Sequence, residues 1–240
     1  MLANMERLTV WLKHAACMAA LTLACLTPAR ADDLDDFNRA VEAAMSHHRV
    51  ASGYLRTGNI DLVRVEIDGL REAWARVSTL PRPTAFRDQE RYTGTILQVA
   101  AQLVGISLVL NLGRPDVARE SLDTIRRMVS GLRRENGVTV LADCVLDANV
   151  AMDALMATDR QPDWESAAAG GESYAETLRR CDGMAPRGIR DHAEFRRLID
   201  GALASLAQFP KAIESRDADL LHRLMIELRS FDNLLAFRYG

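Results

Sequence analysis

The sequence LDDFNRAVEAAMSHHRVASGYL, residues 34–55, indicates the fold class, because its apolar residues recur at the spacing of one helix face. Alternating steps of three and four residues connect Leu34, Phe37, Val41, Ala44, His48, Ala51 and Leu55. Similar stripes follow at Ala118, Leu122, Ile125 and Leu132, and at Leu221, Met225, Leu228 and Leu235. These patterns predict amphipathic helices. Since no window shows the alternation of a strand, we expect an all-α protein.

Four similar turns divide the chain into helices. They are TGNIDL (57–62), LGRPDV (112–117), TDRQPDW (158–164) and SRDADL (215–220). Each combines a helix stop with an acidic residue for the first turn of the next helix. Proline-containing breaks at 81–83 and 186–188 complete a pattern of eight helices.

The two halves of the chain also align with each other. An offset of 101 pairs Thr57 with Thr158, and after the first proline break an offset of 103 pairs Tyr92 with Phe195. The sequence therefore predicts an internal duplication that produces two tandem antiparallel four-helix bundles, residues 33–136 and 137–240. The expected core stripe that opens the second bundle is Val138, Ala142, Val145, Asn149, Met152 and Met156.

The N-terminus has the pattern of a cleaved signal peptide, residues 1–31. Arg7 and Lys13 precede an apolar run over 15–26, and Ala29 and Ala31 supply the small residues before a cleavage site. The run is too short for a membrane span. We also expect no membrane span in the mature chain. A lipid anchor at Cys25 is the less favoured alternative. We predict a periplasmic protein.

The net charge and the cysteine content narrow the kinds of partner and of covalent cross-link that we expect. The chain is mildly acidic, with a net charge of −3, which argues against nucleic acid as a partner. Beyond the signal peptide only Cys144 and Cys181 remain. They fall at similar heights on neighbouring predicted helices in an oxidising compartment, so they either form a disulfide or stay as two buried thiols.

One predicted helix carries no charge from Thr93 to Asn111. Apolar residues line one stripe through Val99 and Leu103 and much of a second stripe through Val104 and Leu108. We expect this helix to contact a protein partner, a second copy of the chain or the other bundle. The alternative is that its few polar residues solvate the outer face.

The adjacent His47 and His48 cannot face one site, because neighbouring helix residues point about 100° apart. His48 lies on the apolar stripe, and its counterpart in the second half is Asn149. Two interpretations stay open for His48. It belongs to a small pocket, or it is hydrogen-bonded in the core and fixes helix register.

Other candidate ligands are scattered. Met45, Met156 and His222, together with His48, are the residues that could hold haem or copper, although methionines at helical spacing also fill cores. The sequence shows no pair of metal ligands at the spacing of a closed metal site, and no recognisable combination of a nucleophile with its catalytic base. We therefore predict no enzymatic activity.

In its turns and its ending, the chain resembles the cytochrome c-prime and soluble b-type four-helix cytochrome superfamily. The segments that carry the resemblance are LGRPDVARE (112–120), SRDADLL (215–221) and FRYG (237–240). The resemblance implies four-helix bundles and a haem site. The c-type attachment motif, Cys-x-x-Cys-His, is absent, and only Met45 imitates a b-type ligand. We therefore expect a cytochrome-like binding or adaptor protein without covalent haem, or alternatively an electron-transfer or ligand-sensing protein with non-covalent haem or copper.

Overall fold

The computed structural model describes residues 29–158 and 163–240, and these residues contain helices and no strand, which confirms the all-α prediction. The predicted signal peptide lies outside the described residues except for 29–31, the first residues of α2. The helices are α2 (Ala29–Thr57), α3 (Ile60–Thr79), α4 (Gln89–Asn111), α5 (Pro115–Glu135), α6 (Leu141–Ala157), α7 (Trp164–Met184), α8 (Arg187–Arg190), α9 (Ala193–Leu206), α10 (Phe209–Glu214) and α11 (Ala218–Tyr239).

Most helix boundaries follow from the turn chemistry. The side chains of Asn59, Asp88 and Asp217 accept a backbone N–H at the starts of α3, α4 and α11. Such caps satisfy donors that the first helical turn leaves without a partner. Gly58 and Gly113 adopt positive φ where α2 and α4 end, a conformation that glycine adopts without strain.

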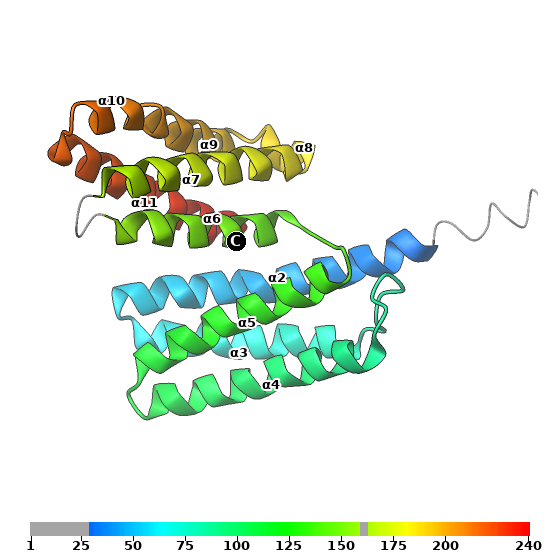
Figure 1. Ribbon diagram of the computed structural model, residues 1–240. Helices are drawn as coiled ribbons and strands as arrows, with labels where there is room; N and C mark the ends of the chain where they lie inside the picture. Colours follow the sequence, from blue (N-terminus) through cyan, green and yellow to red (C-terminus); the bar gives the residue numbers. More distant parts are fainter. Residues whose placement is uncertain (1–28, 159–162) are drawn as a thin grey trace, which may run out of the picture.

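Two separate cores hold the helices, and Figure 1 shows the two sets as separate layers. Helices α2 to α5 surround the first core, with Phe37, Trp74 and Leu103 among its fully buried side chains. Helices α6, α7, α9, α10 and α11 surround the second, with Tyr174 and Phe195. The change from one core to the other falls between Leu132 and Leu141.

The structure differs from the predicted helices of the second half in three places. Val138 precedes α6 and packs against the first core, so its assignment to the second stripe was wrong. Asn149 is half-buried beside the other half of the chain rather than central in its own core. The helix expected between the second proline break and the turn at 215–220 ends at Leu206. The short α10, with proline in its first turn, replaces the last part of that helix.

Cys144 of α6 and Cys181 of α7 form a disulfide, with a Cα–Cα distance of 5.4 Å. Both residues belong to the second core. The counterpart of Cys144 in the first half, at the offset of 101, is Ala43. The covalent link therefore constrains one half only.

A buried ion pair joins the two halves near their connection. Arg133 of α5 donates to Asp143 of α6 at 3.1 Å, and the two side chains are 5% and 2% exposed. Arg133 also donates to Asn38 of α2, and the neighbouring Arg134 donates to Asp147 at 2.7 Å. The partners of each buried charge thus come from both halves.

Helix α4 lies at the outer side of the first half and packs on α3 and α5 (Figure 1). Its inner stripe, which includes Val99, Leu103 and Ile106, is buried. Its outer stripe is not, since Leu97, Val104 and Leu108 are 64%, 59% and 60% exposed. By length and hydropathy alone, α4 is long and apolar enough to cross a membrane, with a third of the relevant window buried.

Candidate functional site

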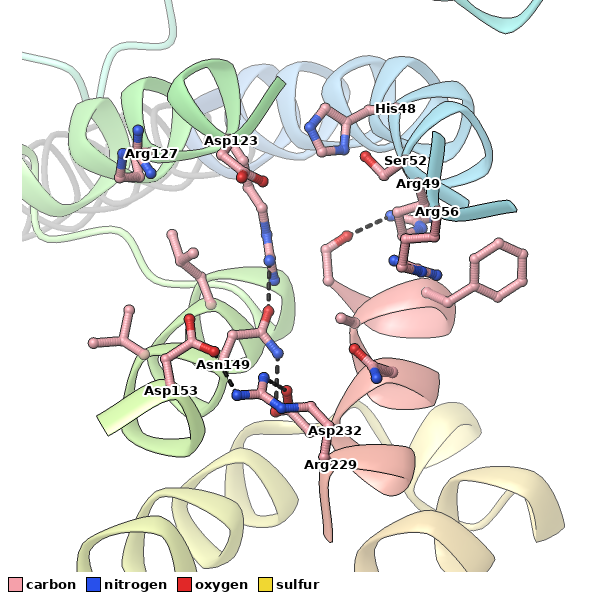
Figure 2. Close-up of a pocket in the computed structure, with 17 residues that line it drawn as sticks. His48, Arg49, Ser52, Arg56, Asp123, Arg127, Asn149, Asp153, Arg229 and Asp232 are labelled. Carbon is pink, nitrogen blue, oxygen red and sulfur yellow. Dashed lines mark hydrogen bonds and ion pairs between the residues drawn. The ribbon is translucent and has the colours of Figure 1, made fainter. Parts of the chain in front are cut away.

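A pocket of about 270 Å³ opens between the two halves (Figure 2). Its walls come from α2 and α5 of the first half and from α6 and α11 of the second. The lining is strongly charged. It includes five arginines, Arg49, Arg56, Arg126, Arg127 and Arg229, and three aspartates, Asp123, Asp153 and Asp232.

A chain of hydrogen bonds crosses this pocket from one half to the other. Arg126 donates to the Asn149 side-chain oxygen at 2.6 Å, and the Asn149 amide donates to Asp232 at 2.9 Å. Arg229 then pairs with Asp232 at 3.3 Å and with Asp153 at 2.7 Å. Asn149 is therefore a connector, because its amide has both a donor and an acceptor.

Asp232 is the most deeply buried acid of the site, at 1% exposure. Burial raises its pKa to about 6, although hydrogen bonding from Asn149 and the nearby charge of Arg229 act in the opposite direction. The Tyr174 hydroxyl also donates to it, at 3.4 Å. At neutral pH Asp232 is thus an ionised group that its neighbours stabilise.

His48 forms part of the opposite wall and is 4% exposed. Its Nε2 lies 2.9 Å from the Leu122 carbonyl oxygen, which can only accept, so Nε2 carries the proton. Desolvation lowers the pKa of His48 to about 4. The ring is therefore neutral at pH 7 and its Nδ1, which has no hydrogen-bond partner, is an acceptor.

His47 lies elsewhere. Its Nδ1 contacts Glu66 of α3 at 2.7 Å, and its ring packs on Gly69, where a Cβ atom would come within 2.7 Å of the ring. The two histidines thus serve different contacts, as the helix geometry requires.

The other predicted ligands do not share a wall with His48. Met45 is buried in the first core, Met156 packs against the second, and His222 lies in the first turns of α11. None of the three lines the pocket.

Arginine and aspartate suit ion pairing rather than an apolar macrocycle, and Nε2 of His48 is engaged by Leu122. The residues present therefore do not fit haem. Within 29–158 and 163–240, no cluster of three histidine, cysteine or acidic residues could hold a metal ion.

The arginines of the pocket were not predicted from the sequence, because arginines on amphipathic helices ordinarily face solvent. A signal was present, however. The offset of 103 pairs Arg126 with Arg229, and the offset of 101 pairs His48 with Asn149, and all four line this pocket.

No protein-family model, curated protein or solved structure matches this chain. The chemistry of the site therefore follows from its own residues. Those residues can hold charge and donate hydrogen bonds. His48, neutral and bonded to a backbone carbonyl, is a poor proton donor at pH 7.

Proposed function

We propose that this chain is a non-catalytic binding or adaptor protein of the periplasm, and that the outer stripe of α4 contacts a protein partner. The observation that carries the proposal is the exposure of Leu97, Val104 and Leu108 on one uncharged helix face. Contiguous exposed apolar surface of this kind is typical of interaction sites.

The spacing of these residues supports one continuous surface. Leu97, Val104 and Leu108 are separated by seven and four residues, which places them on the same side of a helix. Leu112, directly after the helix, is 68% exposed. An uncharged stripe imposes no charge repulsion on a second apolar helix, so it fits the helix-in-groove or helix-on-helix mode of recognition.

We further propose that the two halves are tandem four-helix bundles that arose by duplication. Support comes from the paired sequence offsets and from the two separate cores. The pocket adds an independent argument, because both members of two equivalent pairs face it, His48 with Asn149 and Arg126 with Arg229. A pseudo-twofold arrangement of two copies brings equivalent residues to a shared interface in this way.

A photo-crosslinking amino acid at Leu108 tests the partner surface in cells that export the protein. We expect a discrete crosslinked product, whose composition distinguishes a second copy of the chain from another protein. The matched control is Ile226 on α11, which is 50% exposed but lies away from α4. Absence of a product at position 108, or the same products from both positions, would contradict the proposal.

Export has its own test. Mass spectrometry of the protein released from the periplasm should give an N-terminus at Asp32. A mature protein that retains residues 1–31, or that stays in the cytoplasm, would exclude the proposed compartment.

A further inference from the structure

The pocket between the halves contains buried polar atoms that no protein group satisfies. In the described part of the chain, seven buried side-chain atoms have no hydrogen-bond partner, and three of them belong to residues that line this pocket. They are Nε and Nη2 of Arg126 and Nδ1 of His48. A buried polar atom without a partner costs about 1–3 kcal/mol, and more when it is charged. Their concentration on one cavity indicates that something outside the chain satisfies them.

The equivalent arginine of the second half shows what kind of group is missing. Arg229 has two carboxylates, Asp153 and Asp232. The offsets of 101 and 103 place Ser52 and Val129 at the corresponding positions of the first half. Arg126 therefore lacks both acidic partners that its counterpart possesses.

The geometry of the free edge of Arg126 defines the missing group more closely. Nη1 donates to Asn149, whereas Nε and Nη2 are buried without a hydrogen-bond partner, and Nη2 lies against Gly240, where an added Cβ would come within 2.5 Å of it. These two nitrogens form the parallel fork that binds two oxygens of one carboxylate or phosphate. Burial lowers the pKa of Arg126, but Asp123 and Asp232 oppose this effect, so the guanidinium stays charged.

The surrounding charge favours an anion on this side of the pocket. The wall from the first half contributes Arg49, Arg56, Arg126 and Arg127 but only Asp123. Arg49 is occupied by Glu42, at 2.6 Å, and by the backbone oxygen of Gly240. No ion pair involves Arg56 or Arg127 among the residues described, so the wall retains an excess of positive charge.

We propose that this pocket binds a small organic anion, and that a carboxylate or phosphate group of the ligand takes the Nε and Nη2 donors of Arg126. A volume of about 270 Å³ suits a small metabolite rather than a polymer or a macrocycle. The site has no wall from α4, so it is separate from the proposed partner surface.

His48 adds a preference within this class. Its unpartnered Nδ1 accepts a hydrogen bond, so a ligand with a donor beside its acidic group satisfies it and a simple acid does not. Hydroxy acids and protonated phosphates have such a donor. We therefore infer tighter binding of malate than of succinate.

Calorimetric titration of the full-length mature protein with malate, succinate and inorganic phosphate tests the proposal. We expect saturable binding of at least one of these probes at low ionic strength, with malate bound more tightly than succinate. The three probes distinguish carboxylate from phosphate as the recognised group. No binding of any probe at millimolar concentration would mean that water satisfies these atoms, and would overturn the proposal.

Two variants locate the site. Arg126→Gln should weaken binding roughly tenfold or more, because a charge-assisted hydrogen bond is lost. Ser52→Asp supplies the carboxylate that the second half already has, so it should weaken binding while the protein keeps or gains thermal stability. Arg223→Gln, an exposed position on α11 outside the pocket, is the matched control and should bind as the unmodified protein does. Equal affinity in all three variants would place any binding elsewhere and refute the assignment.

Discussion

The sequence offset of 103 pairs Arg126 with Arg229, yet the surroundings of the two arginines differ. Arg229 is neutralised by two aspartates, and its half also carries the disulfide between α6 and α7. Arg126 lacks acidic partners on its free edge, and its half exposes the apolar stripe of α4. In the second half, these groups therefore satisfy one another within the chain. In the first half, Arg126 and the stripe of α4 remain able to interact with another molecule.

Removal of the disulfide should give the largest effect and should act on the second half alone. A Cys144→Ala/Cys181→Ala protein removes a constraint over a sequence separation of 37. We expect a loss of about 3–4 kcal/mol in the free energy of unfolding, from the added freedom of the unfolded chain. Urea unfolding combined with hydrogen exchange measures it. An equal increase of exchange in α3 and α4 and in α6 and α7 would contradict an effect confined to the second half.

Asp232→Val gives the second half the residue that the first half has at position 129. Arg229 would keep only the exposed Asp153, and Asn149 and Tyr174 would lose their shared acceptor. We expect a destabilisation on the order of 3 kcal/mol at pH 8, since one partner of a buried pair is removed. Asp153→Ser is the control, because that carboxylate is 70% exposed and should contribute less than about 1 kcal/mol. Equal losses from both variants, measured by urea unfolding, would argue against a special role for the buried acid.

His48→Asn likewise places the second half's residue in the first half, and its effect should depend on pH. The folded-state pKa of His48 is about 4, below the unfolded value of 6.5. The unfolded chain therefore binds a proton first, and stability falls as the pH decreases from 6.5 towards 4. At pH 5 this loss is about 2 kcal/mol.

The His48→Asn variant should lose less stability than the unmodified protein between pH 7 and pH 5. Asp232, whose pKa is raised, gains a proton on folding below pH 6 and acts in the opposite direction. It is present in both proteins, so the difference between their pH profiles isolates His48. Parallel profiles would contradict a buried, neutral imidazole.

The smallest effects concern Gly69 and Gly170, which the sequence offset of 101 pairs. In Gly69→Ala the added Cβ meets the ring of His47, a half-exposed side chain that can turn towards solvent. A gain in helix propensity of up to about 1 kcal/mol should offset the lost contact with Glu66, leaving stability nearly unchanged. In Gly170→Ala the neighbour is Leu155, including its Cα at 3.5 Å, which cannot move away as easily. Thermal unfolding should rank Gly170→Ala below Gly69→Ala, and the reverse order would show that these sites are packed differently.

The sequence predicted the parts of this molecule that depend on local patterns. The stripe from Phe37 to Leu55 and the starts of α3, α5 and α11 follow from helical periodicity and turn residues. The pocket depends instead on four helices from both halves. No local pattern in the sequence predicts which arginines of a helix face the other half. Asn149 illustrates the limit. Its pairing with His48 was visible from the offset, but its role as connector required Arg126 and Asp232 to be placed.

The buried pair of Arg133 and Asp143 has a consequence for any partial opening between the two halves. If the contact opened without admitting water, each side chain would be left as an unpaired charge in a dry interface, at a cost of several kcal/mol per ion. Complete separation avoids this cost because water then solvates both charges. We therefore expect this part of the contact either to stay closed or to open together with its hydration.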